Sequence, residues 1–383
     1  LYNDHPNTAP RMYAIDYSGY YTIPERYRGQ VNFGGYTFPR PIVVGRWVKY
    51  KVTGDHGPWS IPPGNCWENA DCEIRPDTLI GQGGNDGSGL TDEQLSTFKV
   101  VRTAAHFECY GYFDCLNGYD NVTLSFGPCH WTFASCSGSN AEEKWEMPAF
   151  LAYMKYEYSD DYKTFFETFG LIPGKGWNEI RIDSIARYSE NIKFQTENDN
   201  IKLCGVVKDG LEENKYAKNW HSYYRFLMAT RLSTDLRRAM WDFTRIRIRD
   251  ILAKEFNING KKIRVGSIVT SEKGVAMLLR WHIRFPGHLF YAEKNSKSIL
   301  QKIIEEVIKT FSDENQARED EILKKISEVD VKNEELEANL KSIYDWDNVP
   351  QKGLKDYYQL NLKKPALSAE KDSFKFCEFE MIT

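Results

Sequence analysis

The 383-residue sequence has no apolar run of about eighteen residues, so it predicts no transmembrane helix. It carries no signal peptide, and because the chain begins at Leu1 we expect a processed or trimmed form. No cysteine spacing is the C-x2-C of a zinc ribbon. The glycine-rich stretch at residues 81–89 lacks the Gly-Lys-Ser/Thr ending of a phosphate-binding loop. The sequence therefore implies no cofactor and no metal site.

The composition can fill a hydrophobic core. Hydrophobic residues make up 41% of the chain and aromatic residues 14%, which excludes wholesale disorder. The length fits two domains, or one large domain with decorations. The many Tyr and Trp residues suit either an aromatic-rich core or a surface that stacks on sugar rings, and composition leaves both open.

Charge is distributed unevenly along the chain. The net charge is −4, yet residues 221–290 hold 14 Lys and Arg against five Asp and Glu. Such a basic block can attract an anionic polymer such as cell wall or nucleic acid, but it also fits a solvated helix face. We favour the solvated face and expect no nucleic-acid partner.

Most of the eight cysteines lie close together in pairs. Loops this short can close as disulfides, and an even count fits an oxidising compartment. We therefore predict three disulfides and an extracytosolic location, the alternative being a cytosolic protein with reduced, half-buried thiols. The predicted pairs are Cys66/Cys72, Cys109/Cys115 and Cys129/Cys136, which leaves Cys204 and Cys377.

A long helix is predicted to begin at a capping box, in which Thr91 and Gln94 precede an apolar run. Apolar residues at helical spacing continue it to Glu108, which falls in the last turn on the buried face. Residues 41–52 alternate like a strand, in a region rich in Tyr, Pro and Gly. Further helices are predicted at residues 147–158, 159–169, 178–190, 219–232, 233–256 and 271–283.

Two highly charged amphipathic helices are predicted near the C-terminus, at residues 297–311 and 317–344. They can pair as a hairpin or coiled coil, either with a protein partner or with the main domain. The predicted fold class is mainly α (α+β) in three parts. These are a small β/irregular segment at residues 1–90, a helical domain at 91–290, and a charged helical extension and tail at 291–383.

Two neighbouring motifs resemble a known glycosidase site. Phe107-Glu108-Cys109-Tyr110-Gly111 puts one carboxyl group at a helix end, and Ser125-Phe-Gly-Pro-Cys-His-Trp-Thr132 is a polar turn. The pattern resembles the goose-type lysozyme and soluble lytic transglycosylase superfamily, in which a lone Glu ends a helix and a Gly-x-x-Gln-like turn closes the sugar groove. Gly127 matches the Gly, and His130 stands where that superfamily has Gln. The resemblance implies a lysozyme-like catalytic domain at residues 91–290.

The same resemblance implies that Glu108 is the general acid of a muramidase that cleaves the glycan strands of peptidoglycan. Such an acid must keep its proton near neutral pH, and burial raises the pKa of a carboxyl group. Asp120 is the first choice for a second carboxylate that activates water, roughly 6.5–9.5 Å away, and Asp114 is the second. A lytic transglycosylase resembles this arrangement but lacks the second acid, and the sequence leaves both mechanisms open.

The expected substrate site includes five further residues. Ser125 and His130 are expected to hydrogen-bond the sugar next to the cleaved bond, and Gly127, Trp131 and Tyr119 to shape the groove around it. The resemblance implies action outside the cytosol, by a protein that is secreted, periplasmic, or delivered by a phage or an injection machine.

Other interpretations of these residues stay open. Glu108 also fits a structural salt bridge at a helix end, and Asp120 fits a residue that caps its own turn. His282 and His288 hint at a metal pair without a third ligand. A Cys129 nucleophile needs a base from elsewhere: His106, His221 or His282. The rival function is a non-catalytic structural or cell-wall-binding protein, such as a virion or tail component.

Overall fold

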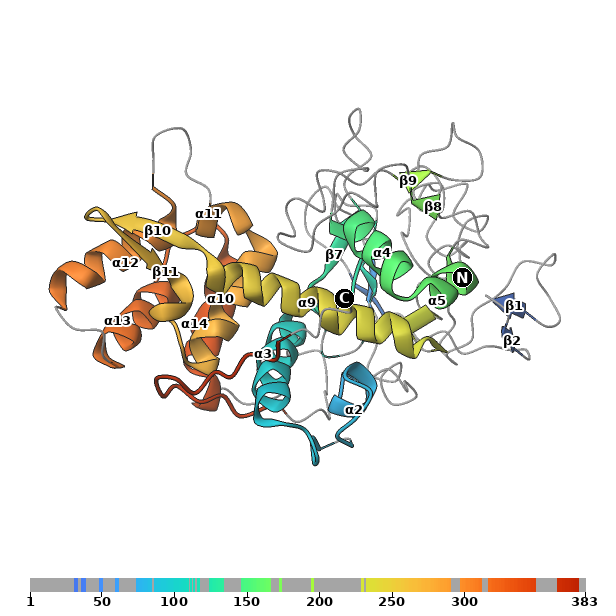
Figure 1. The fold of residues 1–383 in the computed structure, drawn as a ribbon. Helices are drawn as coiled ribbons and strands as arrows, with labels where there is room; N and C mark the ends of the chain where they lie inside the picture. Colours follow the sequence, from blue (N-terminus) through green and yellow to red (C-terminus); the bar gives the residue numbers. More distant parts are fainter. Residues whose placement is uncertain are drawn as a thin grey trace.

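The computed structural model is mainly helical, with helices in 64% and strands in 5% of the residues that it describes (Figure 1). The predicted mainly α class is therefore confirmed. The described residues are 31–33, 36–38, 48–50, 59–61, 74–84, 86–109, 111, 113, 116–117, 124–133, 146–166, 172–173, 194–195, 229–230, 232–290, 297–311, 316–348 and 364–378.

Helix α3 (Asp92–Cys109) begins where the sequence predicts it. The Thr91 N–H donates to Gln94 Oε1 at 3.0 Å, and the Gln94 N–H donates to Thr91 Oγ1 at 3.2 Å, which is the predicted capping box. Beyond this first turn nearly every residue of α3 is buried, so the helix runs through the interior. Its last turn therefore carries Glu108 into the core.

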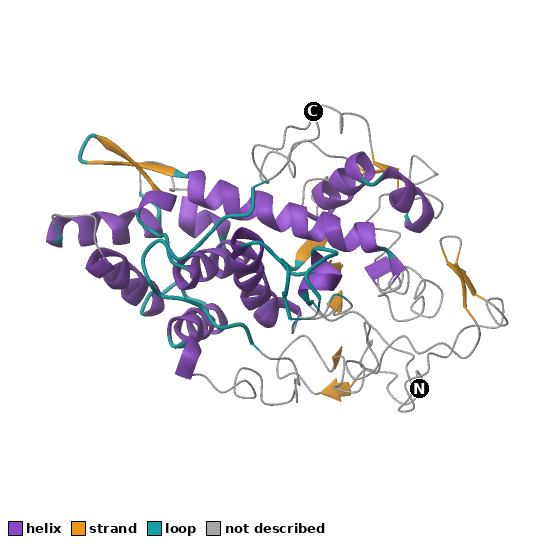
Figure 2. Ribbon diagram, turned by 60° about the horizontal axis from the view of Figure 1, so that its bottom comes forward, coloured by secondary structure: helices purple, strands orange, loops and turns teal. Residues whose placement is uncertain are grey.

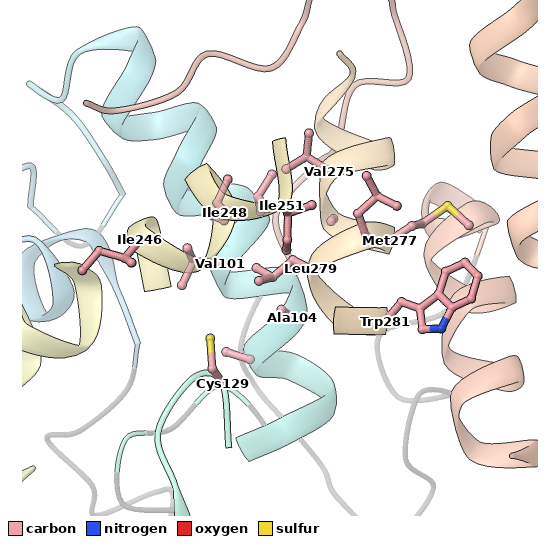
Figure 3. Close-up of a cluster of buried hydrophobic side chains, with 14 of the residues drawn as sticks. Val101, Ala104, Cys129, Ile246, Ile248, Ile251, Val275, Met277, Leu279 and Trp281 are labelled. Atoms are coloured by element: carbon pink, nitrogen blue, oxygen red, sulfur yellow. The ribbon is translucent and has the colours of Figure 1, made fainter. Parts of the chain in front are cut away.

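Helices α9 (Thr234–Ala253) and α10 (Glu272–Arg284) form the centre of the core together with α3. Each begins at a serine whose hydroxyl accepts a backbone N–H: Ser233 from Leu236 at 2.7 Å, and Ser271 from Gly274 at 3.0 Å. Both helices lie where the sequence predicts them. Figure 3 shows the cluster in which they meet, with Val101, Ala104, Cys129, Ile246, Ile248, Ile251, Val275, Met277, Leu279 and Trp281 labelled.

Helices α4 (Glu146–Glu157) and α5 (Ser159–Phe165) pack against α9 on the side away from α10 (Figure 1). The buried carboxylate of Asp242 in α9 connects these elements through hydrogen bonds. It accepts from the Tyr153 hydroxyl at 3.1 Å and from the Tyr158 hydroxyl at 2.6 Å, and lies 2.5 Å from Arg245 Nη2. The predicted helix at residues 159–169 ends early, at Phe165.

The C-terminal helices belong to the main core. Helices α12 (Ile299–Thr310), α13 (Gln316–Ser327) and α14 (Glu334–Tyr344) pack on one another, and α13 and α14 also contact α10. Their apolar faces are thus covered within the chain. The single helix predicted at 317–344 is wrong, because Lys332 has a positive φ of 58° and the Asn333 side chain accepts from Leu336 N to start α14.

An unpredicted hairpin follows α9. Strands β10 (Glu255–Ile258) and β11 (Lys261–Arg264) pair antiparallel across Asn259-Gly260, both at positive φ (52° and 78°). A two-residue Asn-Gly turn with this backbone matches the twist of a hairpin. The hairpin projects from the helical body in Figure 2, and Asn257 O accepts from Gln301 Nε2 of α12 at 3.2 Å.

The remaining elements are short. Strand β3 lies within the strand predicted at residues 41–52, while the helix predicted at 178–190 lies outside the described residues, as does most of the one predicted at 219–232. The elements are the antiparallel pairs β1 (Val31–Phe33) with β2 (Tyr36–Phe38), β3 (Val48–Tyr50) with β4 (Trp59–Ile61), and β8 (Ile172–Pro173) with β9 (Phe194–Gln195), helices α2 (Pro76–Leu79) and α11 (Pro286–Phe290), and 3-10 turns η4 (Val265–Ser267) and η5 (Trp346–Asn348).

The disulfides predicted for Cys109 and Cys129 are wrong, because both residues are buried thiols that are not disulfide-bonded. Cys109 Sγ donates to the Ala105 carbonyl oxygen at 3.4 Å, and Cys129 Sγ contacts Thr244 Oγ1 at 3.4 Å, so both thiols are engaged inside the core. The other cysteines of the predicted pairs, Cys66, Cys72, Cys115 and Cys136, lie outside the described residues.

The basic block at residues 221–290 is not simply a solvated face. Its residues Arg245, Arg247 and Arg280 are all buried. A buried charge is stable only beside counter-charges and hydrogen-bond acceptors, so these arginines bind other parts of the chain. Arg280 is the one that matters for the candidate site.

Candidate functional site

The candidate site lies where the end of α3 meets α10 and the turn between β6 (Leu124–Phe126) and β7 (Trp131–Phe133). Glu108 Oε2 lies 2.9 Å from His130 Nδ1, and Glu108 Oε1 lies 2.6 Å from Arg280 Nη1. We call these three residues the Glu108 triad. The Glu108 side chain is 8% exposed and that of Arg280 2%, whereas His130 is 21% exposed. The triad therefore extends from the interior to the surface.

The turn that presents His130 requires its glycine. Gly127 has a φ of 84°, and a Cβ there would lie 2.7 Å from the Trp131 ring, closer than side chains pack. The His130 N–H donates to Gly127 O at 2.9 Å, and His130 itself has a positive φ of 51°. The sequence-predicted turn thus brings His130 onto Glu108.

Two arginines of α10 provide the positive charge around Glu108. Arg280 makes the direct contact, and Arg284, one helical turn later, contributes at longer range. Residues four apart on a helix lie on the same face, so one side of α10 directs both charges towards the end of α3.

The charges decide the ionisation of Glu108. Burial is the largest single effect and raises the pKa of Glu108. The Arg280 charge, the His130 hydrogen bond and charge, and the Arg284 charge all lower this pKa, and their sum exceeds the effect of burial. The net result is a fall from 4.5 to about 2, so Glu108 is a carboxylate at neutral pH. The expectation that burial keeps it protonated is wrong, because a guanidinium from a distant helix shares its surroundings.

The other expected site residues are distributed differently. Trp131 is fully buried and stacks on Phe150 at 4.6 Å between ring centroids, so its ring belongs to the core and is not open to a sugar. Ser125 lies in β6, where its backbone pairs with Asn117 and Thr132. The other expected residues, Asp114, Tyr119 and Asp120, lie outside the described residues.

The alternative chemistries gain little from the geometry. The Cys129 thiol is buried against Thr244, which does not suit an accessible nucleophile. His282 is buried beside Arg247, and burial and the arginine charge lower its pKa well below 6.5. His288 stacks on Phe285 at 4.8 Å. No group of three or more His, Cys, Asp and Glu is placed to hold a metal in the part of the chain that the structure describes.

Arg280 belongs to the candidate site but does not stand out in the sequence. The nearest residue with a predicted role is His282, as half of a possible metal pair with His288. The useful signal was the position of Arg280 on an apolar helix, where a charged residue needs a buried partner. Which carboxylate it binds depends on how α10 packs on α3.

In comparisons with known proteins, no protein-family model, no curated protein and no solved structure matches this chain. Among the helices that the structure describes, none is long and apolar enough to span a membrane.

Proposed function

We propose that the protein cleaves the glycan strands of peptidoglycan, with the Glu108 triad as its catalytic centre. The observation that carries the proposal is the 2.9 Å contact between His130 Nδ1 and Glu108 Oε2. It joins the helix-end carboxylate to the turn residue that the lysozyme-like resemblance assigns to the sugar groove. A partly exposed histidine on a buried carboxylate gives a substrate oxygen access to an acidic pair.

The ionised state of Glu108 constrains the mechanism. A carboxylate with a pKa of about 2 holds almost no proton at neutral pH, so it cannot by itself protonate a leaving oxygen. His130 is the donor in this mechanism, because it is the more exposed member of its pair with Glu108. Its imidazole passes a proton to the glycosidic oxygen of the bound sugar, while Glu108 stays a carboxylate beside Arg280.

The second half of the reaction needs a nucleophile. The C1–O bond breaks as the leaving oxygen gains the proton, and the anomeric carbon is then attacked by water or by a hydroxyl of the substrate itself. In the first case Asp120 or Asp114 takes the proton from water, and a reducing-end sugar forms. In the second case an anhydro-sugar forms.

A second candidate is a non-catalytic protein that binds the cell wall or takes part in an assembly. One observation favours it: Glu108 has a basic side chain on each oxygen, His130 on one and Arg280 on the other, which is also the arrangement of a structural ion pair. On this proposal the triad stabilises the fold, and the charged surface of α12–α14 serves assembly with a protein partner.

Cell-wall digestion by purified protein distinguishes the two. Glu108→Gln by itself is a poor test, because it leaves the Arg280 guanidinium buried without its counter-charge and destabilises the fold. We therefore pair it with Arg280→Met, so that both charges are removed together. The catalytic proposal predicts that the parent clears a cell-wall suspension, and that the folded double variant loses at least about a hundredfold of the rate.

Glu272→Gln is the matched control. Glu272 is another buried carboxylate, ion-paired to Lys99 at 3.2 Å, at the opposite end of α10. It should lose stability but keep the parent rate per folded molecule. A parent that sediments with the cell wall without releasing any sugar would support the non-catalytic candidate. Mass spectrometry of the released fragments separates hydrolysis from transglycosylation by one water per cleavage.

A further inference from the structure

The C-terminal residues 364–378, here called the tail segment, lie across the main helices as an extended chain. Fifteen residues, 349–363, separate the tail segment from η5. In Figure 1 the red tail segment runs from beside α14 to α3. It contacts a surface here called the tail groove, which consists of Ser96, Thr97, Arg245, Thr270, Glu272 and Trp346.

Two hydroxyl groups of α3 bind the backbone of the tail segment. Ser96 Oγ accepts from Lys375 N at 3.0 Å and contacts Ser373 O at 3.5 Å. Thr97 Oγ1 accepts from Cys377 N at 2.8 Å and donates to Lys375 O at 3.0 Å. The contacts fall on every second tail residue, as expected for a strand that presents one edge to the helix.

The start of α10 binds the tail segment in the same way. The Glu272 carboxylate accepts from Ser368 N at 3.0 Å. Thr270 accepts two more tail N–H groups, with its carbonyl oxygen from Phe374 at 2.9 Å and with its hydroxyl from Asp372 at 2.9 Å. Backbone contacts of this kind are available to any extended peptide, so specificity must come from side chains.

A few apolar side chains of the tail segment pack against the core. Leu367 is buried, while Phe374 and Phe376 are half-buried against the core and Glu370 between them is exposed. At the far end, Arg245 Nη1 donates to Glu378 O at 3.0 Å. A main chain held by polar groups, with a few apolar anchors, is how proteins commonly bind extended peptides.

We propose that the tail groove is a peptide-binding surface, which the tail segment fills within one chain and which the tail segment of a second copy fills when two copies exchange. Exchange keeps every contact of the closed form, so its free-energy cost is small. The 15 intervening residues can span up to about 50 Å when extended, which is enough to reach a neighbouring molecule. Trp346 Nε1 donates to Pro365 O at 2.7 Å, so docking within one chain needs little of that reach.

The test uses the full chain with a protease site inserted between residues 350 and 363. After cleavage, a dye-labelled peptide of residues 364–378 is added and its anisotropy is measured. We expect saturable binding and release of the original tail segment. Leu367→Asp in the peptide should weaken binding at least tenfold, because it charges the buried anchor, while Glu370→Gln should leave it unchanged. Thr97→Val in the chain removes two hydrogen bonds and should weaken binding about tenfold or more.

The uncleaved chain provides a second measurement that does not depend on surviving cleavage. In a chain with Leu367→Asp, the chain's own tail segment should bind the tail groove less tightly and so compete less with added peptide. That chain should therefore bind the labelled parent peptide at least tenfold more tightly than the parent chain does. Equal binding to both chains, or a cleaved tail segment that leaves only when the protein unfolds, overturns the proposal. Sedimentation tests the exchange: the parent should form dimers at high concentration, and a parent that stays monomeric there refutes that part.

Discussion

The ion pair of Glu108 with Arg280 makes the sharpest prediction about stability. We expect Arg280→Met to destabilise the protein by about 3–5 kcal/mol at pH 7, because it leaves a buried carboxylate without its main counter-charge. Glu108→Gln should cost a similar amount, since it leaves the buried guanidinium unpaired. The double variant should cost much less than the sum of the two, with a coupling of about 3 kcal/mol or more.

The pH dependence has a definite sign. The pKa of Glu108 is lowered from 4.5 to about 2, so its ionisation stabilises the folded protein above pH 4.5 and is lost as the pH falls towards 2. The shift corresponds to about 3 kcal/mol, to order of magnitude. In the Arg280→Met variant the main charge that opposes burial is gone, so the pKa of Glu108 should be higher than in the parent. That variant should therefore lose less stability than the parent when the pH falls. The coupling should therefore shrink by about 1 kcal/mol between pH 7 and pH 3.5.

Urea unfolding of the parent, both single variants and the double variant measures this coupling at each pH. Groups that titrate independently of the pair cancel in the cycle. The matched control is the cycle of Lys99→Met and Glu272→Gln, whose Lys99 side chain is 29% exposed, so its coupling should be smaller. A Glu108–Arg280 coupling below about 1 kcal/mol, or one that does not change with pH, would refute the reasoning.

Three further predictions concern the fold. Gly127→Ala should lower the free energy of unfolding by about 2–4 kcal/mol, because a Cβ there meets the Trp131 ring. Gly260→Ala is the control: its φ of 78° is similar but the space around it is open, so it should lower the free energy of unfolding by only about 1–2 kcal/mol. Thermal unfolding measures both, and equal losses of stability would contradict the predicted clash. Cys109 and Cys129 should react with maleimide only after denaturation, without reductant, while Cys377 reacts in the native protein; denatured protein in which the first two stay unreactive would indicate disulfides. Glu319→Ala should lower the free energy of unfolding by about 3 kcal/mol, because the Glu319 carboxylate accepts hydrogen bonds from Thr270 N, Thr270 Oγ1 and Ser271 N just before α10. Glu328→Ala, at an exposed position, is the control and should stay within about 0.5 kcal/mol of the parent in urea unfolding.

Local signals were sufficient to predict individual helices. The capping box at Thr91 and Gln94, and the apolar spacing that ends at Glu108, predict α3 almost to the residue. Both signals depend on residues within one or two turns, which no distant contact needs to complete. The Asn259-Gly260 hairpin is an equally local signal, but it lies between the helices predicted at 233–256 and 271–283, in a stretch to which no element is assigned. Asn333 is also a local N-cap signal, but the helix predicted at 317–344 runs across it.

The sequence by itself determined the mainly α class, the position of Glu108 at a helix end, and the turn that carries His130. Only the tertiary structure decided what those residues do to one another. The ionisation of Glu108 depends on Arg280, which lies far along the chain on α10, and the burial of the Cys109 thiol depends on how α3 packs in the core. Electrostatic effects act through space and grow as water is excluded, so they follow from packing, which sequence spacing does not specify.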